Sequence, residues 1–165
     1  MAEIRLRPGT RDDAQSLARL SLESSAYYSE IAPETHAPGE SDGFAEWIAA
    51  EWDEGPETLA LVADIDGEIA GYLEARIQEP PVWGRFFGNR DLRERRLFIN
   101  ALLTAEAYRR RGVATRLVDA AENWGREHGA TVARLDTFYD SPASVPFWEK
   151  RMGYRRRSII FRKPL

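Results

Sequence analysis

The feature that most constrains this fold is a mostly apolar segment that runs directly into an arginine-rich turn and then into a helix. Residues 97–105 form an apolar run of the length that a buried strand needs. The turn Tyr108-Arg-Arg-Arg-Gly-Val-Ala-Thr115 follows almost at once, and residues 113–128 repeat apolar side chains at helical spacing. A strand and a helix joined so closely pack against each other, so we expect an α/β or α+β domain.

The same turn has the chemistry of an anion site. The first N–H groups of a helix have no partner within the helix, and the helix dipole favours negative charge there. Gly112 and Ala114 are small enough for a ligand to approach the backbone, and Thr115 adds a hydroxyl. The segment lacks the Gly-Lys-Ser/Thr of a P-loop and the three glycines of a dinucleotide fingerprint. It predicts a phosphate or pyrophosphate site; the alternative is an ordinary turn with solvated arginines.

Shorter patterns place the remaining elements. Thr10-Arg-Asp-Asp13 has the form of a capping box, and Asp66-Gly67 is a two-residue hairpin turn. The expected order is a strand at 4–6, a helix at 10–28, a loop at 29–42, a helix at 44–55, hairpin strands at 58–65 and 68–77, an irregular segment at 79–96, the strand and helix above, a strand at 131–138, a short helix at 147–152 that could begin nearer Ser144, and a strand at 158–161. No repeat or linker interrupts this order, so we expect a single domain over residues 1–165.

Charge is divided unevenly along the chain. The formal net charge is −4, but residues 1–82 carry 18 acids and 5 arginines, whereas residues 83–165 carry 9 acids and 18 basic residues. A basic half suits an anionic ligand and an acidic half suits a cation. The alternative, that the opposite charges attract each other across one compact fold, stays open.

The sequence also disfavours several classes of function. Cysteine is absent, which excludes disulfides, thiolate metal sites and a cysteine nucleophile. His36 and His128 belong to no spaced ligand motif, so no metal is expected. No apolar run is long enough to span a membrane, and residues 1–8 do not resemble a signal peptide, so we expect a soluble cytoplasmic protein. Arginines cluster within 93–96 and 155–157, but the chain is acidic and lacks a nucleic-acid motif, so no nucleic-acid partner is expected.

Four segments carry a family resemblance. They are Ile4–Ala14, Ile65–Tyr72, the loop Arg109–Ala114 and the block Phe147–Tyr154. In order, they resemble the first strand and turn, the hairpin of strands two and three, the (Gln/Arg)-x-x-Gly-x-(Gly/Ala) loop and the Tyr-Glu-Lys-x-Gly-Phe block of the GNAT superfamily of N-acetyltransferases. The resemblance implies a mixed, mostly antiparallel, twisted sheet of six to seven strands. About four helices would flank the sheet, which would splay at a central parallel strand pair.

The resemblance also implies acetyl-CoA as donor and CoA as product. In this family the loop amides cradle the CoA pyrophosphate, and the preceding strand binds pantetheine. The reaction implied is direct transfer: an unprotonated amine attacks the thioester, a backbone N–H stabilises the oxyanion and a proton donor helps the thiolate leave. The implied cofactor-binding residues are Leu102, Leu103, Thr104, Arg109, Arg110, Arg111, Gly112, Val113, Ala114, Thr115, Ser141, Ser144, Phe147 and Trp148.

Two positions depart from the family pattern. The family's usual acid is a tyrosine where this chain has Trp148, whose indole does not ionise usefully but can pack against pantetheine. The usual asparagine aligns with Ser141, which either keeps that polar role or caps a helix before Pro142. Glu74 is a candidate base or else a surface charge, and Tyr139 is a candidate acid or else packs in a loop.

The resemblance places the acceptor side over roughly residues 14–55. From residue 20 onward this region has acids and no lysine or arginine, and Tyr27 and Tyr28 are candidate substrate-binding residues. Coulomb and cation–π attraction favour a cationic small-molecule or peptide amine; alternatively, the acids are solvated and the aromatic residues pack in the core. We expect an N-acetyltransferase, a monomer or homodimer. The alternative is an acyl-CoA-binding or sensing module with weak or no turnover.

Overall fold

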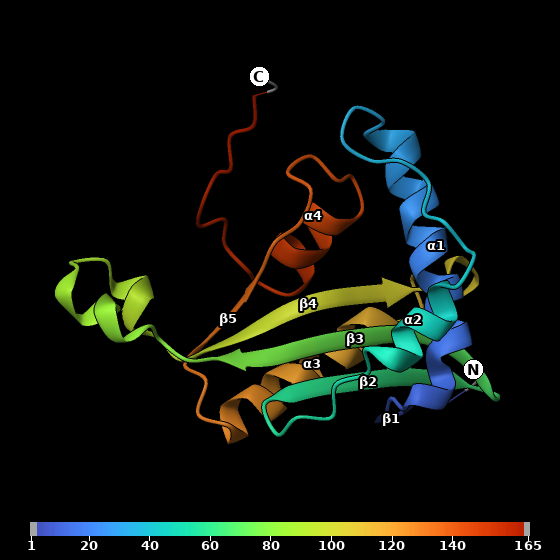
Figure 1. The fold of residues 1–165 in the computed structure, drawn as a ribbon, viewed down its shortest axis with the longest axis horizontal. Helices are drawn as coiled ribbons and strands as arrows, with labels where there is room; N and C mark the ends of the chain where they lie inside the picture. The colour runs from blue at the N-terminus through green and yellow to red at the C-terminus, as the bar shows by residue number, and fades with distance from the viewer. Residues whose placement is uncertain (1–2, 164–165) are drawn as a thin grey trace.

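One mixed β-sheet organises the computed structural model, which describes residues 3–163. Its strands lie side by side in chain order: β1 (Arg5–Pro8), β2 (Thr58–Ile65), β3 (Glu68–Gln78), β4 (Arg96–Thr104) and β5 (Val132–Leu135) (Figure 1). Neighbours pair antiparallel except β4 and β5, which are parallel. The predicted mixed, mostly antiparallel sheet is confirmed. The predicted six to seven strands are wrong, because the described residues form five.

Helices cover both faces of this sheet. One face carries α1 (Ala14–Ile31), which follows a 3-10 turn at Arg11–Asp13, and α2 (Phe44–Ala50); the other carries α3 (Val113–Glu127) and α4 (Ser144–Pro146), which continues as a π-helical turn at Phe147–Arg151 (Figure 1). Successive strand residues point to opposite faces. Val62 accordingly packs with Leu17 of α1, whereas Ala63 belongs to the core cluster that contains Leu117 of α3.

The start of the first helix is fixed by the predicted capping box. The Thr10 N–H donates to Asp13 Oδ2 at 2.8 Å, and Arg7 donates to both oxygens of the Asp13 carboxylate, at 2.9 and 2.7 Å. Hydrogen bonding from the Arg7 guanidinium holds the pKa of Asp13 below its usual value. The charged pair therefore joins the end of β1 to the beginning of the helical segment.

The N-terminal end of α3 lies very close to β3, because residue 71 is a glycine. A Cβ at Gly71 would lie 2.6 Å from Val113 Cγ1 and 3.1 Å from Leu117 Cδ1. It would also lie 3.0 Å from the carbonyl oxygen of Leu103 on β4. The beginning of α3 is thus held against the sheet next to the end of β4.

The predicted strand at 158–161 is wrong. Residues 154–163 form no helix or strand, and Ile159, Ile160 and Phe161 are largely exposed. A strand needs a neighbour for its N–H and C=O groups, and none within residues 3–163 pairs with this segment. The parallel pair therefore lies at the edge of the sheet and not at its centre. Two other elements are shorter than predicted: β5 ends at Leu135, and α2 ends at Ala50.

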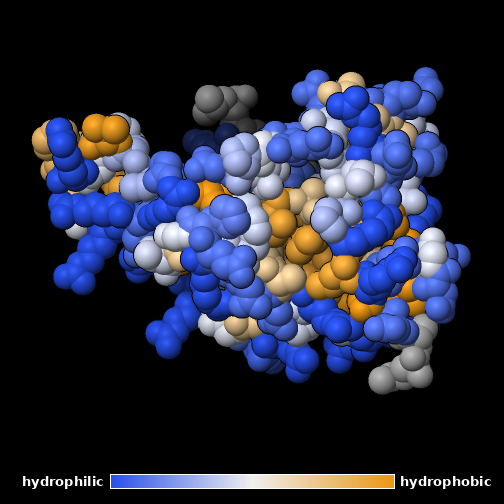
Figure 2. Space-filling model, turned by 90° about the horizontal axis from the view of Figure 1, so that it is seen from below, coloured by the Kyte–Doolittle hydropathy of each residue, from blue (hydrophilic) through white to orange (hydrophobic). Residues whose placement is uncertain are grey.

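Residues 79–95, predicted to be irregular, form a lobe that projects beyond the end of the sheet. The lobe holds two 3-10 turns, Val82–Phe86 and Arg90–Arg93 (Figure 1). Figure 2 shows apolar surface at the tip of this lobe, on the left, where the exposed apolar residues are Val82, Trp83, Phe86 and Phe87. Within the described residues, no helix is both long and apolar enough to cross a membrane.

Candidate functional site

Strands β4 and β5 run together for a short distance and then separate. Their pairing extends from Arg96 opposite Val132 to Ile99 opposite Leu135, whereas β4 continues to Thr104. Figure 1 shows the two strands diverging from a common start, with β5 leading toward α4. Beyond Ile99, no strand within residues 3–163 pairs with β4 on this side. Its backbone groups there are available to hydrogen-bond an extended ligand.

A β-bulge marks the point of separation. Glu74 of β3 pairs with Ala101, and the next residue, Ala75, pairs with Ile99, so Asn100 is the extra residue. A bulge bends its strand and increases the local twist. The predicted pantetheine-binding residues 102–104 lie directly after this bend and are half-buried.

The arginine-rich turn leaves the first N–H groups of α3 free. Arg110 and Gly112 adopt left-handed conformations, with φ of 64° and 87°. A Cβ at Gly112 would meet nothing within 4 Å. The first N–H of α3 with an acceptor is that of Arg116, which donates to the Gly112 carbonyl at 3.1 Å; those of residues 113–115 have no acceptor among residues 3–163. Free N–H groups, open space and a helix dipole together fit a phosphate or pyrophosphate.

Arginines add positive charge around this turn. Arg109 lies over the ring of Tyr27 at 5.5 Å and Arg111 over the ring of Tyr108 at 5.3 Å. These contacts orient the guanidinium groups without neutralising them. A further arginine, Arg151, donates to the Thr115 hydroxyl at 3.4 Å. The turn therefore combines free backbone donors with positively charged side chains.

The segment after β5 brings the predicted serines to the same region. Ser141 is 1% exposed, and its hydroxyl accepts the Ser144 N–H at 3.1 Å, as a helix cap does. The same hydroxyl lies 3.4 Å from that of Tyr28. Ser144 in turn places its hydroxyl 2.7 Å from that of Thr137. Ser141 thus holds the first N–H of α4 and makes a polar contact with α1, and its role toward a cofactor stays a prediction.

Trp148 lies in the core. It is 7% exposed, and its ring centroid is 5.0 Å from those of both Phe147 and Tyr154. Because the Trp148 side chain is so deeply buried, a ligand could contact only an edge of its indole ring. Phe147 is half-buried and has more surface to offer.

An aromatic cluster joins the end of α1 to the segment after β5. Tyr28 stacks on His36 with ring centroids 5.2 Å apart, and Phe138 meets these two rings edge-on at 6.5 and 5.7 Å. Tyr27 contacts Tyr28 at 5.3 Å and carries Arg109 on its ring. The candidate substrate-binding residues Tyr27 and Tyr28 are thus gathered beside the anion-binding turn. Nothing local in the sequence marks His36 or Phe138 as a site residue, because their contact joins segments about one hundred residues apart.

The two candidate proton-transfer residues have different surroundings. Glu74 is half-buried on β3, and its carboxylate accepts the Tyr72 hydroxyl at 3.2 Å. Burial, with Glu74 close by, raises the pKa of Tyr72 far above its usual value, so this tyrosine stays neutral. Tyr139 is 78% exposed and packs against Phe138 with ring centroids 5.0 Å apart.

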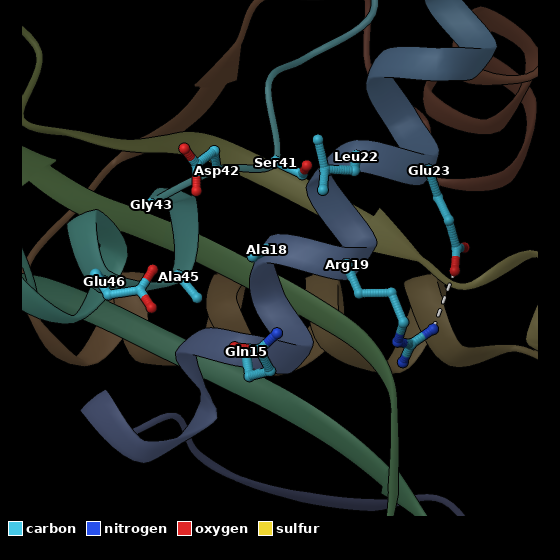
Figure 3. Close-up of a pocket in the computed structure, with 10 residues that line it drawn as sticks. All are labelled: Gln15, Ala18, Arg19, Leu22, Glu23, Ser41, Asp42, Gly43, Ala45 and Glu46. Carbon is cyan, nitrogen blue, oxygen red and sulfur yellow. Dashed lines mark hydrogen bonds and ion pairs between the residues drawn. The ribbon is translucent and has the colours of Figure 1, made fainter.

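A pocket of about 680 Å³ lies between α1 and the segment that leads into α2. Figure 3 shows an ion pair in it between Arg19 and Glu23, at 3.0 Å. Glu23 also accepts the N–H of Glu106, which lies shortly before the anion-binding turn, at 3.2 Å. Three of the residues that line the pocket are acids and one is basic, so a cationic group suits the pocket. The lining residues are Gln15, Ala18, Arg19, Leu22, Glu23, Ser41, Asp42, Gly43, Ala45 and Glu46.

Comparison with known proteins identifies the family of this chain. The model of the acetyltransferase (GNAT) family matches residues 22–154. The chain belongs to the GNAT acetyltransferase family. This match covers most of α1, the sheet from β2 onward, the anion-binding turn and the block that ends at Tyr154. No curated protein matches this GNAT chain.

Solved structures share the GNAT fold at low sequence identity. A mutant of the BH1408 protein from Bacillus halodurans is 18% identical, with a TM-score of 0.81 over 98% of this chain and 99% of that one. A transcriptional regulator from Bacillus halodurans C-125 is 17% identical, with a TM-score of 0.72 over 99% and 100%. The aminoglycoside N-acetyltransferase AAC(6')-Iy, in complex with a bisubstrate analog of CoA and acetylneamine, is 20% identical, with a TM-score of 0.68 over 99% and 100%. At these identities the likeness shows the fold alone.

Proposed function

We propose that the whole chain acts as one acetyl-CoA-dependent N-acetyltransferase, which transfers the acetyl group to a primary amine of a cationic small molecule or peptide. The observation that carries the proposal is the set of free N–H groups of residues 113–115 at the end of the gap between β4 and β5. An anionic, extended thioester donor fits both features at once. The CoA-bound GNAT relative AAC(6')-Iy supports this choice of donor.

The residues of the turn and of β4 would hold the donor. Free amides and Arg109–Arg111 suit its phosphates. Residues 102–104 pair with β3 on one side, and on the other side the β5 pairing ends at Ile99, so the backbone groups on that side suit the amides of pantetheine. Ser141, Ser144 and Phe147 would line the donor site from the segment after β5, and Trp148, which is buried beside Phe147, would support it from the core. When bound, the donor supplies a thioester carbonyl that a neutral amine can attack.

Charge supports a cationic acceptor. Residues 20–75 contain 14 acids and no lysine or arginine, and the pocket between α1 and α2 carries Glu23, Asp42 and Glu46. Tyr27 and Tyr28 add aromatic faces on which an ammonium group can rest. Glu74 and Tyr139 stay candidates for the base and the acid.

The test uses two measurements on the intact protein. Millimolar CoA or acetyl-CoA should raise the melting temperature, because a ligand at about 100 times its Kd adds about 2.7 kcal/mol of stability. Thiol release from acetyl-CoA should require an amine. Spermidine, neamine and a lysine peptide should outperform neutral and anionic amines, and rising salt should narrow that preference. Absence of any CoA-induced shift would overturn the proposal.

A second candidate function is that of an acyl-CoA-binding or sensing module. The observation that favours it is Trp148, which replaces the usual tyrosine acid and is buried. Such a module would show the CoA-induced shift in melting temperature but no amine-dependent thiol release. Since a thiolate leaves readily without a protonating group, we favour the enzyme.

A further inference from the structure

His36 is held firmly in the loop after α1. Its ring stacks on Tyr28 at an interplanar angle of 26° and meets Phe138 edge-on at 87°. Its backbone N–H donates to the Ala32 carbonyl at 3.0 Å, which fixes the turn that carries it. The ring is half-buried, so a substrate can still reach it.

Hydrogen bonds indicate which ring nitrogen is free. His36 Nδ1 lies 2.8 Å from the Thr35 hydroxyl oxygen, and that hydroxyl donates to the Ala32 carbonyl at 3.3 Å. We assign the ring proton to Nδ1, because the Thr35 hydroxyl can then donate its single proton to Ala32 and accept from Nδ1–H. Nε2 then carries the lone pair, and within residues 3–163 no hydrogen bond occupies it. An imidazole oriented through Nδ1, with Nε2 free, is arranged as a general base.

The position of His36 relates it to the donor site. Its stacking partner Tyr28 lies 3.4 Å from Ser141 through their hydroxyls, and the adjacent Tyr27 lies beneath Arg109 of the anion-binding turn. The titratable and charged groups around the ring are Tyr27 and Tyr28 from α1, Arg109 from the turn and Tyr139 beside Phe138. Among the described residues, no carboxylate pairs with the ring.

We propose that His36 is the general base that deprotonates the acceptor, an inference that rests on the proposed function. An N–H bond of the ammonium breaks, its proton moves to Nε2, and the electron pair stays on nitrogen. The neutral amine forms a bond to the thioester carbonyl carbon, and the C–S bond breaks with its electron pair on sulfur. The excess proton on the new amide nitrogen passes to that sulfur, which yields the amide and the CoA thiol. His36 returns its own proton to water.

The test is His36→Gln, with saturating acetyl-CoA and the fastest acceptor of the amine screen. We expect kcat at neutral pH to fall about 100-fold, while the CoA-induced rise in melting temperature is unchanged. The acidic limb of the pH–rate profile should vanish, and the deficit should shrink as the pH approaches the pKa of the acceptor itself. His128→Gln is the matched control. His128 also stacks on an aromatic ring, that of Trp124, with Nδ1 2.8 Å from a carbonyl, but it lies at the other end of α3. This variant should keep the full rate.

The outcomes separate the two proposals. A wild-type protein that neither binds CoA nor releases thiol contradicts the proposed function itself. An active wild type with a His36→Gln variant of unchanged rate and profile overturns the role of His36, as does loss of the acidic limb in Glu74→Gln instead. Loss of the basic limb in His36→Gln would make His36 an acid and overturn the proposal. Thr35→Val, which removes the partner of Nδ1, should lower kcat by a smaller factor, and Thr35→Ser should restore it.

Discussion

Replacing Gly71 by alanine tests how closely α3 approaches the sheet. The backbone of Gly71 is not in the left-handed region, and the residue lies in the middle of β3, so alanine fits locally. Chain entropy alone would make Gly71→Ala stabilising by about 0.4–1 kcal/mol. The sign of the measured effect therefore reports on packing.

The contacts of the new methyl group predict that Gly71→Ala destabilises the protein. The new methyl would lie 2.6 Å from Val113 Cγ1, about 0.8 Å inside an ordinary contact of 3.4 Å, and 3.0 Å from the Leu103 carbonyl oxygen, which cannot rotate away. Overpacking of this kind costs about 1–3 kcal/mol. After subtraction of the entropy gain, we expect a loss of about 1–2 kcal/mol, or about 2–8 °C in Tm for a domain of this size.

Urea unfolding of Gly71→Ala, Val113→Ala and the double variant measures the clash directly. Val113→Ala removes the nearest methyl, so the double variant should be about 1 kcal/mol more stable than the sum of the single effects. Gly71→Ala should also weaken the CoA-induced shift, because Val113 begins α3 and carries one of the free N–H groups. A stabilised Gly71→Ala, or strict additivity, would refute the close approach.

Three further changes test other parts of the molecule. Gly112→Leu should abolish the CoA-induced rise in Tm. Gly67→Leu is the control, because Gly67 has a φ of 86° and equally open surroundings; it should incur the same backbone strain and keep the CoA-induced rise. Loss of the CoA-induced rise in both variants would contradict the site. Trp148→Phe removes part of a buried ring and leaves a cavity, so it should cost about 1–3 kcal/mol in thermal unfolding. Turnover should fall by less than about 100-fold, and a larger loss of turnover with normal binding would give the indole a chemical role. The pKa of Asp13 is lowered in the folded protein, so its ion pair contributes stability that is present above about pH 4 and lost as the pH falls through the folded pKa. Asp13→Asn should therefore be less stable than the wild type at pH 7, and the two stabilities should converge in acid. Parallel curves of stability against pH would contradict the ion pair.

Elements whose signal is local could be predicted from the sequence. The hairpin follows from Asp66-Gly67, whose two residues both adopt positive φ as such a turn requires. The capping box at Thr10 and Asp13 forms as its spacing predicts. The turn at residues 108–115 combines glycine and three arginines just before a helix, and the first N–H groups of that helix have no acceptor among residues 3–163, as a local signal of this kind predicts. In each case the residues that determine the structure are neighbours in the chain.

Features that depend on distant partners could not be predicted. The segment at 158–161 has strand-forming residues, but a strand forms only where another strand pairs with it. Trp148 departs from the family motif, and its burial depends on a core cluster that also contains Ala63 of β2 and Leu117 of α3, both distant in the chain. His36 shows no sequence signal, because its contacts come from Tyr28 and from Phe138, about one hundred residues away.

The burial of Trp148 and the placement of His36 have a joint consequence for proton transfer. A tyrosine at position 148 could protonate the departing sulfur, but an indole keeps its proton, and this one faces other aromatic rings in the core. The sulfur leaves as a thiolate or takes the proton that the amine nitrogen gives up after the C–N bond forms. Under the proposed function, the step that needs help is then removal of the first proton, because a cationic amine is unreactive until it is neutral. The proposed base for that step is His36, whose stacking partner Tyr28 adjoins Tyr27 beneath Arg109, and no hydrogen bond within residues 3–163 joins a carboxylate to its ring.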